Sequence, residues 1–471
     1  MVSERSLLEQ EVLLQIRPTP EEKEHMQKIA RCLIDAIEER GITAMVVGSV
    51  ARNTWVSGDR DLDIFMLYDP SVPREELEQR GLSLAREVAL AFGAEYREKY
   101  AEHPYINASI GGTDVDLVPC YLLGDARALQ CAVDRTPFHT RYIRERINDY
   151  IDDVLLAKQF AKAGGVYGSD QMTEGFSGYL TELLVLHYGG FIPLLRAASC
   201  WRPGTLIDPE QHQQKDFHDP LVVIDPVDPE RNVSASVSLT RMYEFVELAR
   251  GYLAAPSRGF FFPPQEEVYS CLEFRNELAR RGTVLYAVSF DTPPYIEDIV
   301  VPQLRKSTEA IRELLARNEF VVNRTDYQMR PDRSILLFEL LVDRIPPVKR
   351  HSGPPLWNRA NAEKFSSKYL DDGDSRLYCG PFIDNGVYFV EIARRYTDAG
   401  ELLRSRDIFD VALGRHVKIS MAGHYQVDKD EACWMEENAA FISGFLQKAS
   451  PCIRRKKEEH AADPGPHPFV S

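Results

Sequence analysis

The pattern of apolar and polar residues near the start of the chain predicts a long amphipathic helix. Thr19, Pro20 and Glu22 form a capping box with proline at the first helical position. Apolar residues then recur at helical spacing and form one stripe, made of Met26, Ile29, Ala30, Leu33, Ile34 and Ile37. Such a stripe is typical of a helix that packs on a sheet. We therefore expect this helix to cover the sheet formed by the next segment.

Strict alternation replaces the helical spacing after residue 60. Leu62 to Tyr68 reads as a strand, and Asp61 and Asp63 lie two residues apart, so both carboxylates point to one face. Two carboxylates on one face repel each other unless a cation lies between them, and hard oxygen ligands suit Mg²⁺ or Mn²⁺. The pattern predicts a divalent metal site.

Gly48 and Ser49 end an apolar strand and begin a short helix just before that site. Free backbone N–H groups and a hydroxyl at such a point bind anions. A phosphate site beside carboxylates that bind metal is what transfer of a nucleotide from a triphosphate requires.

A two-metal site needs a third carboxylate, and the segment GGTDVDLVPCY supplies two candidates. Asp114 and Asp116 alternate on an apolar strand that could pair beside the first. We favour Asp116 because it directly precedes the apolar run Leu117, Val118, Pro119.

The remaining periodicity predicts an α+β fold with several domains. The catalytic segment is completed by a helix over about 74–92 and by strands near 94–99, 105–110 and 113–119. Residues 147–253 read as largely helical. A β-α-β-β pattern follows, with a strand at 283–290, a helix at 301–318 and strands at 320–323 and 334–343.

The segment PPVKRHSGPP, residues 346–355, is basic and rich in proline, and we expect it to be irregular. A helix at 361–369 and a strand pair around the turn at 383–388 come after it. Bases and aromatic residues interleave in this region, as they do on many RNA-binding surfaces. A solvated loop is the alternative interpretation.

The length, cysteine pattern and charge of the chain exclude several classes of protein. The chain has 471 residues, so more than one core is expected. Its eight cysteines are scattered without C-x-x-C pairs, which argues against a disulfide framework or a zinc cluster. No apolar run approaches the length of a membrane span, and the N-terminal residues are acidic. We therefore expect a cytoplasmic protein that does not bind a membrane. The net charge of −16 disfavours nucleic acid for the chain as a whole but does not exclude a local basic patch.

Motifs in a fixed order resemble the archaeal-type (class I) CCA-adding enzymes, tRNA nucleotidyltransferases of the DNA polymerase β-like superfamily. The resemblance rests on G-S-x-x-R-x-T-W at 48–55, D-x-D at 61–63 and V-D-x-V-P-C-Y at 115–121. It continues through AEHPY, AVDRTPFH, GVYG, GFSGYLTELL, DPVDPERNV and APSRGFF, and it is dense up to residue 261 and thin beyond.

The resemblance implies a mixed-sheet nucleotidyltransferase palm domain, a helical central domain and C-terminal α+β RNA-binding domains. We expect the catalytic domain at 1–146 and the central nucleotide-binding domain at 147–256. The body of the C-terminal part would comprise 257–330 and 385–453, and a tail domain contacting tRNA would comprise 331–384. Residues 454–471, with mixed charge followed by proline, glycine and histidine, are expected to be disordered.

The resemblance also implies stepwise, template-independent addition of CMP, CMP and AMP to the 3′ end of tRNA, with CTP and ATP as substrates. Asp61 and Asp63 would hold two Mg²⁺ ions, with Mn²⁺ as an alternative, and Asp116 would join them on one metal. Contacts with the nucleotide would come from Gly48, Ser49, Arg52, His103, Thr136, His139, Lys158, Tyr167 and Arg231.

Arg231 is the residue that matches the family's base-selecting arginine. Lys349 and Arg350 would contact the RNA, whose acceptor stem and elbow are the expected partner surfaces. A homodimer is left open.

Two other functions fit part of the pattern. Another polymerase β-like enzyme, such as a poly(A) polymerase or an oligoadenylate synthase, would share G-S and D-x-D, but not the DRTPFH and DPVDPERNV context. A non-catalytic RNA-binding module would be marked by loss of a metal carboxylate, whereas all three are present.

Overall fold

The computed structural model describes residues 5–100, 103–265, 267–370, 376–451 and 453. The chain divides into two compact units, Met1–Gln265 with Ala449–Ser471 (unit 1) and Glu266–Lys448 (unit 2). The segment 454–471, which we predict to be disordered, lies outside the described residues. Within the described part, no helix is long and apolar enough to cross a membrane.

A five-stranded mixed sheet lies at the centre of the catalytic part of unit 1. Its order is β1-β2-β5-β4-β3, with β2 and β5 parallel and the other pairs antiparallel. The strands are β1 (Thr43–Val47), β2 (Asp61–Tyr68), β3 (Glu95–Tyr100), β4 (Pro104–Ile110) and β5 (Thr113–Tyr121). The mixed sheet and its strands agree with the sequence prediction to within a few residues.

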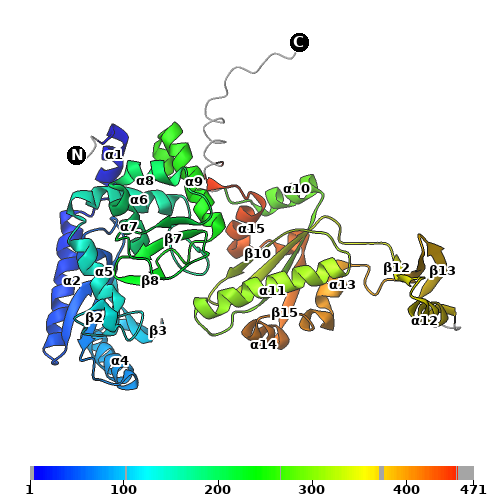
Figure 1. Cartoon of the computed structure of the whole chain (residues 1–471), viewed down its shortest axis with the longest axis horizontal. Coiled ribbons are helices and arrows are strands. Elements are labelled where there is room, and N and C mark those ends of the chain that lie inside the picture. Colours follow the sequence, from blue (N-terminus) through cyan, green and yellow to red (C-terminus); the bar gives the residue numbers. More distant parts are fainter. Residues whose placement is uncertain (1–4, 101–102, 266, 371–375, 452, 454–471) are drawn as a thin grey trace, which may run out of the picture. The chain divides into compact units, whose positions relative to one another are not determined.

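Helices α2 (Pro20–Glu38) and α4 (Arg74–Ala91) cover one face of this sheet (Figure 1). The predicted capping box of Thr19 and Glu22 begins α2. Leu33, Leu62, Ile64 and Leu117 are buried in the core between these layers. Because side chains alternate along a strand, Asp61 and Asp63 point to the opposite face. The short helix α3 (Gly48–Arg52) lies on that carboxylate side, since Gly48 abuts the Asp63 carboxylate, and helix α5 (Arg135–Arg144) contacts α3.

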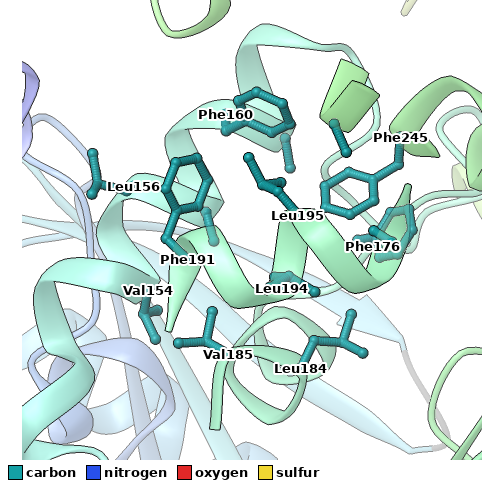
Figure 2. Close-up of a cluster of buried hydrophobic side chains, with 14 of the residues drawn as sticks. Val154, Leu156, Phe160, Phe176, Leu184, Val185, Phe191, Leu194, Leu195 and Phe245 are labelled. Atoms are coloured by element: carbon teal, nitrogen blue, oxygen red, sulfur yellow. The ribbon is translucent and has the colours of Figure 1, made fainter. Parts of the chain in front are cut away.

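The helical part of unit 1 has its own core, built around Phe160, Phe191 and Phe245 (Figure 2). Its helices are α6 (Ile151–Ala163), α7 (Gly178–Tyr188), α8 (Phe191–Ala198) and α9 (Leu239–Ala254). Helix α1 (Leu7–Ile16) buries Val12 and Leu13 in the same core, so residues 7–16 pack with the helical part and not with the catalytic sheet.

A small sheet interrupts the helical pattern predicted for 147–253. It has the order β6-β7-β8, formed by β6 (Thr205–Ile207), β7 (Leu221–Asp225) and β8 (Asp228–Asn232). The motif DPVDPERNV therefore forms a tight turn and a strand, because Pro226 and Val227 connect β7 to β8. Strand β7 is buried throughout.

Unit 2 contains a four-stranded antiparallel sheet of order β10-β11-β9-β15. The strands are β9 (Val284–Asp291), β10 (Val322–Met329), β11 (Arg333–Leu340) and β15 (Tyr425–Lys429). The helices are α10 (Cys271–Arg281), α11 (Glu297–Arg317), α13 (Ala399–Arg404), α14 (Arg415–Gly423) and α15 (Ala439–Leu446). The predicted β-α-β-β pattern is present as β9, α11, β10 and β11.

A second sheet in unit 2, of order β12-β14-β13, forms with helix α12 the part that we name the tail module. Its elements are β12 (Val348–Pro355), α12 (Arg359–Leu370), β13 (Leu377–Asp384) and β14 (Val387–Ala393). The predicted tail boundaries, 331–384, are displaced from these elements at both ends. β11 pairs with β9 in the larger sheet, and β14 is the central strand of the tail module.

The prediction of an irregular segment at 346–355 is wrong, because most of it is strand β12. Among the described strands, β12 lies at the edge of its sheet and pairs with β14 alone. An edge strand tolerates proline, which cannot donate to a ladder hydrogen bond, and the register is irregular between Ser352 and Pro355.

Candidate active site

The strand register brings the three predicted metal carboxylates to one face of the catalytic sheet. Asp63 pairs with Asp116 across the parallel β2–β5 ladder, and Asp61 pairs with Asp114. The Asp116 carboxylate accepts a hydrogen bond from Asn107 Nδ2, on β4, at 2.7 Å. Asn107 is the residue opposite Asp116 in the β4–β5 ladder, so this contact follows from the register.

These carboxylates are held in surroundings that disfavour their charge. Burial and the neighbouring charge of Asp116 raise the pKa of Asp63 to about 6, although Arg52 opposes the shift. Burial also raises the pKa of Asp61, with Asp59 and Asp114 adding to the effect. The pKa of Asp116 is raised by burial, against the hydrogen bond from Asn107. The face thus carries excess negative charge that a cation would relieve.

Gly48 allows the backbone of α3 to approach this face closely. Its φ is +71°, a conformation that favours glycine, and a Cβ on Gly48 would lie 2.1 Å from Asp63 Oδ2. Any side chain at this position would displace the carboxylate. Ser49 follows in the first turn of α3, so the predicted order of strand, turn, short helix and second strand is present.

The donor set fits a hard divalent cation, since it consists of carboxylate oxygens on a shared face. The Gly48 backbone leaves room for the Asp63 carboxylate. Among the described residues, no three His, Cys, Asp or Glu side chains already converge closely enough to form a metal-binding group. The case for a metal therefore rests on ligand chemistry and on the raised pKa values.

Arg52 and Lys158 meet on one buried carboxylate, Glu182 of α7. Arg52 Nε lies 2.8 Å from Glu182 Oε2, too poorly aligned for a hydrogen bond, and Lys158 Nζ lies 2.9 Å from Oε1. Lys158 also donates to the Thr54 carbonyl at 2.8 Å, and the Thr54 hydroxyl donates to Glu182 at 2.5 Å. Burial alone would raise the pKa of Glu182, but the charges of Arg52 and Lys158 lower it.

This arrangement changes the role that Lys158 can play. Its side chain is 2% exposed and its ammonium already has partners in Thr54 and Glu182. Direct contact with a triphosphate would require these bonds to open. The predicted nucleotide contact of Lys158 thus stays a prediction, while its structural contacts are plain.

His139 and Arg231 meet on a second buried carboxylate, Asp225, at the end of β7. His139 Nε2 lies 2.8 Å and Arg231 Nη1 2.6 Å from Asp225 Oδ2. The Tyr179 hydroxyl donates to Oδ1 at 3.1 Å, and the His139 ring stacks on the Tyr179 ring at 4.0 Å. The structure therefore brings together two of the predicted nucleotide contacts.

Three further predicted residues occupy different surroundings. Tyr167 is half-buried, with Lys162 Nζ 5.3 Å from its ring centroid, and burial and the charge of Glu182 raise its pKa, so it remains a neutral phenol. Thr136 lies in the first turn of α5. His103 is 1% exposed, and burial lowers its pKa, with smaller effects from the charges of Glu78, Arg74 and Asp134. No contact found in the described residues joins His103 to the carboxylate face.

The predicted RNA-binding pair lies in the tail module, on adjacent residues of β12. The Arg350 guanidinium pairs with Asp384 and lies 3.7 Å from the centroid of the Phe389 ring. Lys349 points to the other face, because successive strand residues alternate. Phe365 of α12 contacts His351 on that face. The two bases therefore face opposite sides of the sheet.

Comparison with known families assigns the chain along nearly all its length. Residues 27–145 match the nucleotidyltransferase domain, and residues 152–262 match the tRNA nucleotidyltransferase second domain. Residues 281–430 match the CCA-adding enzyme C-terminal domain. A CCA-adding enzyme of Methanoregula boonei is 58% identical over 445 residues, covering 94% of this chain and 96% of the relative. The chain belongs to the CCA-adding enzymes.

Other CCA-adding enzymes match at lower identity and over a slightly smaller share of each chain. The enzyme of Methanosarcina acetivorans is 41% identical, over 90% of this chain and 94% of its own. That of Halorubrum lacusprofundi is 44% identical, over 86% and 90%. Among solved structures, a Cid1 poly(U) polymerase matches 54% of this chain and 95% of its own at 16% identity, with a TM-score of 0.43. That similarity is too distant to carry an argument.

Membership of the CCA-adding enzymes decides between the functions left open by the sequence. The match at 281–430 separates the chain from a poly(A) polymerase or an oligoadenylate synthase. The nucleotidyltransferase domain at 27–145 and the high identity to CCA-adding enzymes separate it from a non-catalytic shell.

Glu182 and Asp225 are two residues of this CCA-adding enzyme that sequence analysis did not single out. Both side chains are fully buried. Glu182 interrupts the apolar helix GYLTELLVLHY, and Asp225 ends the apolar strand LVVID. A charge inside an apolar element must be paired, and this signal was available in the sequence. Its partners were not, because they come from distant segments.

Proposed function

We propose that the chain adds C, C and A to the 3′ end of tRNA, with CTP and ATP as substrates and without a nucleic-acid template. The observation that carries the proposal is the β2–β5 register. It sets Asp61, Asp63 and Asp116 on one face beside the turn at Gly48, in a chain 58% identical to a CCA-adding enzyme. This is the donor arrangement that in-line transfer of a nucleotide from a triphosphate requires.

Asp61 and Asp63 would hold two Mg²⁺ ions, or Mn²⁺, and Asp116 would join them on one ion. Bound divalent ions lower the pKa of the attacking 3′-hydroxyl and offset the charge that develops on the leaving pyrophosphate. The Asn107 amide donates to Oδ1 of the Asp116 carboxylate, which leaves the other carboxylate oxygen for a ligand. The raised pKa of Asp63 favours the approach of a cation to this face.

The triphosphate would lie against Gly48, Ser49 and Arg52, where α3 begins with N–H groups that no side chain caps. The Arg52 guanidinium is buried beside Glu182 and would have to leave that carboxylate to contact a phosphate directly. Thr136 and Tyr167 offer hydroxyl donors, and His103 remains a proposed contact from the family pattern alone. Lys158 would act on the nucleotide indirectly, by holding Glu182 and Thr54 in place. It would contact the triphosphate directly only if these bonds broke. His139 and Arg231 would lie nearer the base.

The tRNA would bind unit 2 through its acceptor stem and elbow, with the tail module as one contact surface. Arg350 on Phe389 offers a flat cation beside an aromatic ring, which suits stacking on RNA. Lys349 offers a point charge for phosphate. Burial and the charges of Lys349 and Lys368 lower the pKa of His351. A cytoplasmic location belongs to the same proposal, and a homodimer stays open.

The test uses the purified full chain, tRNA lacking its 3′ CCA, Mg²⁺ and labelled CTP or ATP. We expect two C residues and then one A to be added, and no addition when Mg²⁺ is chelated. Addition of a long homopolymer, or no addition to any tRNA end, would contradict the proposal. Product length on a sequencing gel distinguishes these outcomes.

A further inference from the structure

Two buried carboxylates organise the predicted nucleotide contacts, and each joins groups from both parts of unit 1. Glu182 holds Arg52 of the catalytic part and Lys158 of the helical part. Asp225 holds His139 of the catalytic part and Arg231 of the helical part. Ionised carboxylates are costly to bury without partners, so each network is tied together by its charge.

Asp225 is ionised and fixes its partners on two sides. Burial alone would raise its pKa, but the hydrogen bond from His139 and the charge on Arg231 bring the pKa down to about 2. An ionised carboxylate only accepts hydrogen bonds, so His139 must carry its proton on Nε2 when the ring is neutral. The remaining oxygen accepts from Tyr179 and from the Val227 backbone at 3.1 Å each.

Arg231 is the partner through which this network can reach a base. Its side chain is 36% exposed, whereas those of Lys158 and Glu182 are 2% and 0% exposed. Asp225 binds Nη1, and among the described residues the other guanidinium nitrogens of Arg231 have no assigned partner. A guanidinium held at one nitrogen has fewer orientations open to it, and its remaining planar donors can distinguish the edge of cytosine from that of adenine.

We infer that Asp225 is a positioning residue for nucleotide choice: it holds Arg231 in the orientation that separates CTP from ATP. Glu182, by contrast, holds groups placed toward the triphosphate, which both nucleotides share. This inference rests on the proposed function, because it needs a reaction that uses both nucleotides in turn.

The experiment compares Asp225→Asn with Glu182→Gln in the full-length protein. Single-turnover and steady-state kinetics give kcat and KM for CTP and ATP on tRNA lacking CCA and on tRNA ending in CC. Asp225→Asn should reduce the preference for the correct nucleotide by about tenfold, the effect of one hydrogen bond to a charged group. Glu182→Gln should lower kcat/KM for both nucleotides by a similar factor and leave their ratio unchanged.

A control variant shows whether loss of any buried charge produces the same result. Glu339 in unit 2 is fully buried and pairs with Arg281 and Arg324, so Glu339→Gln removes a matched charge from the unit that does not contain the catalytic sheet. It should leave the CTP-to-ATP ratio as in wild type. A ratio changed equally by Glu339→Gln would overturn the inference.

A double mutant tests whether Asp225 acts through Arg231. In an Arg231→Ala background, Asp225→Asn should change the CTP-to-ATP ratio no further. Independent, multiplying effects would overturn the inference, and so would an Asp225→Asn ratio equal to wild type at each stage.

One more variant and the wild-type activity complete the test. If Asp225→Asn does not fold, Asp225→Glu retains the charge but displaces the carboxylate, and an unchanged ratio in that variant overturns the inference. If wild type adds neither nucleotide to tRNA, the proposed function fails instead, so the two failures are distinguishable.

Discussion

The Asp63 carboxylate lies between the Gly48 backbone and the Asp116 carboxylate, and its raised pKa has a consequence for stability. The folded protein binds a proton at Asp63 more tightly than the unfolded chain, whose pKa is the ordinary 3.8. The cost of the buried charge is thus fully present above pH 6 and is relieved as the pH falls from about 6 toward 4.

We predict that Asp63→Asn abolishes nucleotide addition and raises the melting temperature of the metal-free protein at pH 8 by a few degrees. The gain should shrink as the pH falls toward 5, because wild type then binds the proton itself. Thermal unfolding in EDTA across this pH range measures both effects. A variant less stable than wild type at pH 8 would show that the charge at Asp63 is not a cost.

Asp116 and Asp114 offer a second comparison at this scale, since they lie on one face of one strand. Asp116 is opposite Asp63 and is held by Asn107, whereas Asp114 is exposed and opposite Asp61. We predict that Asp116→Ala abolishes incorporation of both nucleotides and leaves tRNA binding largely intact. Asp114→Ala should stay within about fivefold of wild type, as expected for a surface charge. Loss of turnover in Asp114→Ala with normal turnover in Asp116→Ala would reverse the assignment of the third ligand.

Two lysines of helix α6 make ion pairs that differ in burial. Lys158 pairs with buried Glu182, and Lys162 pairs with Asp59 at 2.6 Å where both side chains are about a third exposed. Lys158→Met should cost about 3–5 kcal/mol, since it leaves Glu182 with Arg52 as its one remaining cation. Lys162→Met should cost at most about 1 kcal/mol. Denaturant unfolding of both variants checks the difference, and equal costs would contradict the burial argument.

Strand β12 separates two bases by the alternation of its side chains. We predict that Lys349→Gln flattens the dependence of log tRNA affinity on log salt by about one unit, the value of one lost phosphate contact. Arg350→Gln should weaken binding with a smaller change in slope, because its charge is already paired with Asp384 and its plane lies on Phe389. Filter binding at several salt concentrations measures both slopes. An unchanged slope in Lys349→Gln would place the phosphate contacts elsewhere.

At the scale of the whole molecule, two units with separate cores should unfold as two transitions. A ligand stabilises the unit that binds it, so CTP with Mg²⁺ should raise the transition of unit 1 and leave that of unit 2 unchanged. Glu339→Gln should lower the transition of unit 2 alone, because Glu339 pairs within that unit. Differential scanning calorimetry resolves the transitions. A single transition shifted as one by both changes would show that the units unfold together.

The net charge of −16 is also a property of the whole molecule, and it does not decide the partner. RNA affinity depends on bases that face the RNA, and the tail module gathers Lys349 and Lys368 around His351. The net charge of the chain therefore disfavours RNA, whereas the local basic surface of the tail module favours it.

Features that depend on local periodicity could be predicted from the residues alone. The capping box of Thr19 and Glu22, the alternation that turns Asp61 and Asp63 to one face, and the glycine turn at Gly48 are all present where the residues predicted them. Each depends on the φ/ψ preferences and side-chain directions of neighbouring residues, so a short window contains the cause.

The tertiary structure alone decided which distant segments meet. The pairing of Asp63 with Asp116, of Lys158 with Glu182 and of Asp225 with His139 joins residues 53, 24 and 86 positions apart. The assignment of β11 and β14 to different sheets depends in the same way on their pairing partners. Apolar periodicity shows that an element is buried but not against what, because burial is nondirectional, whereas the cost of an unpaired buried charge selects one specific partner.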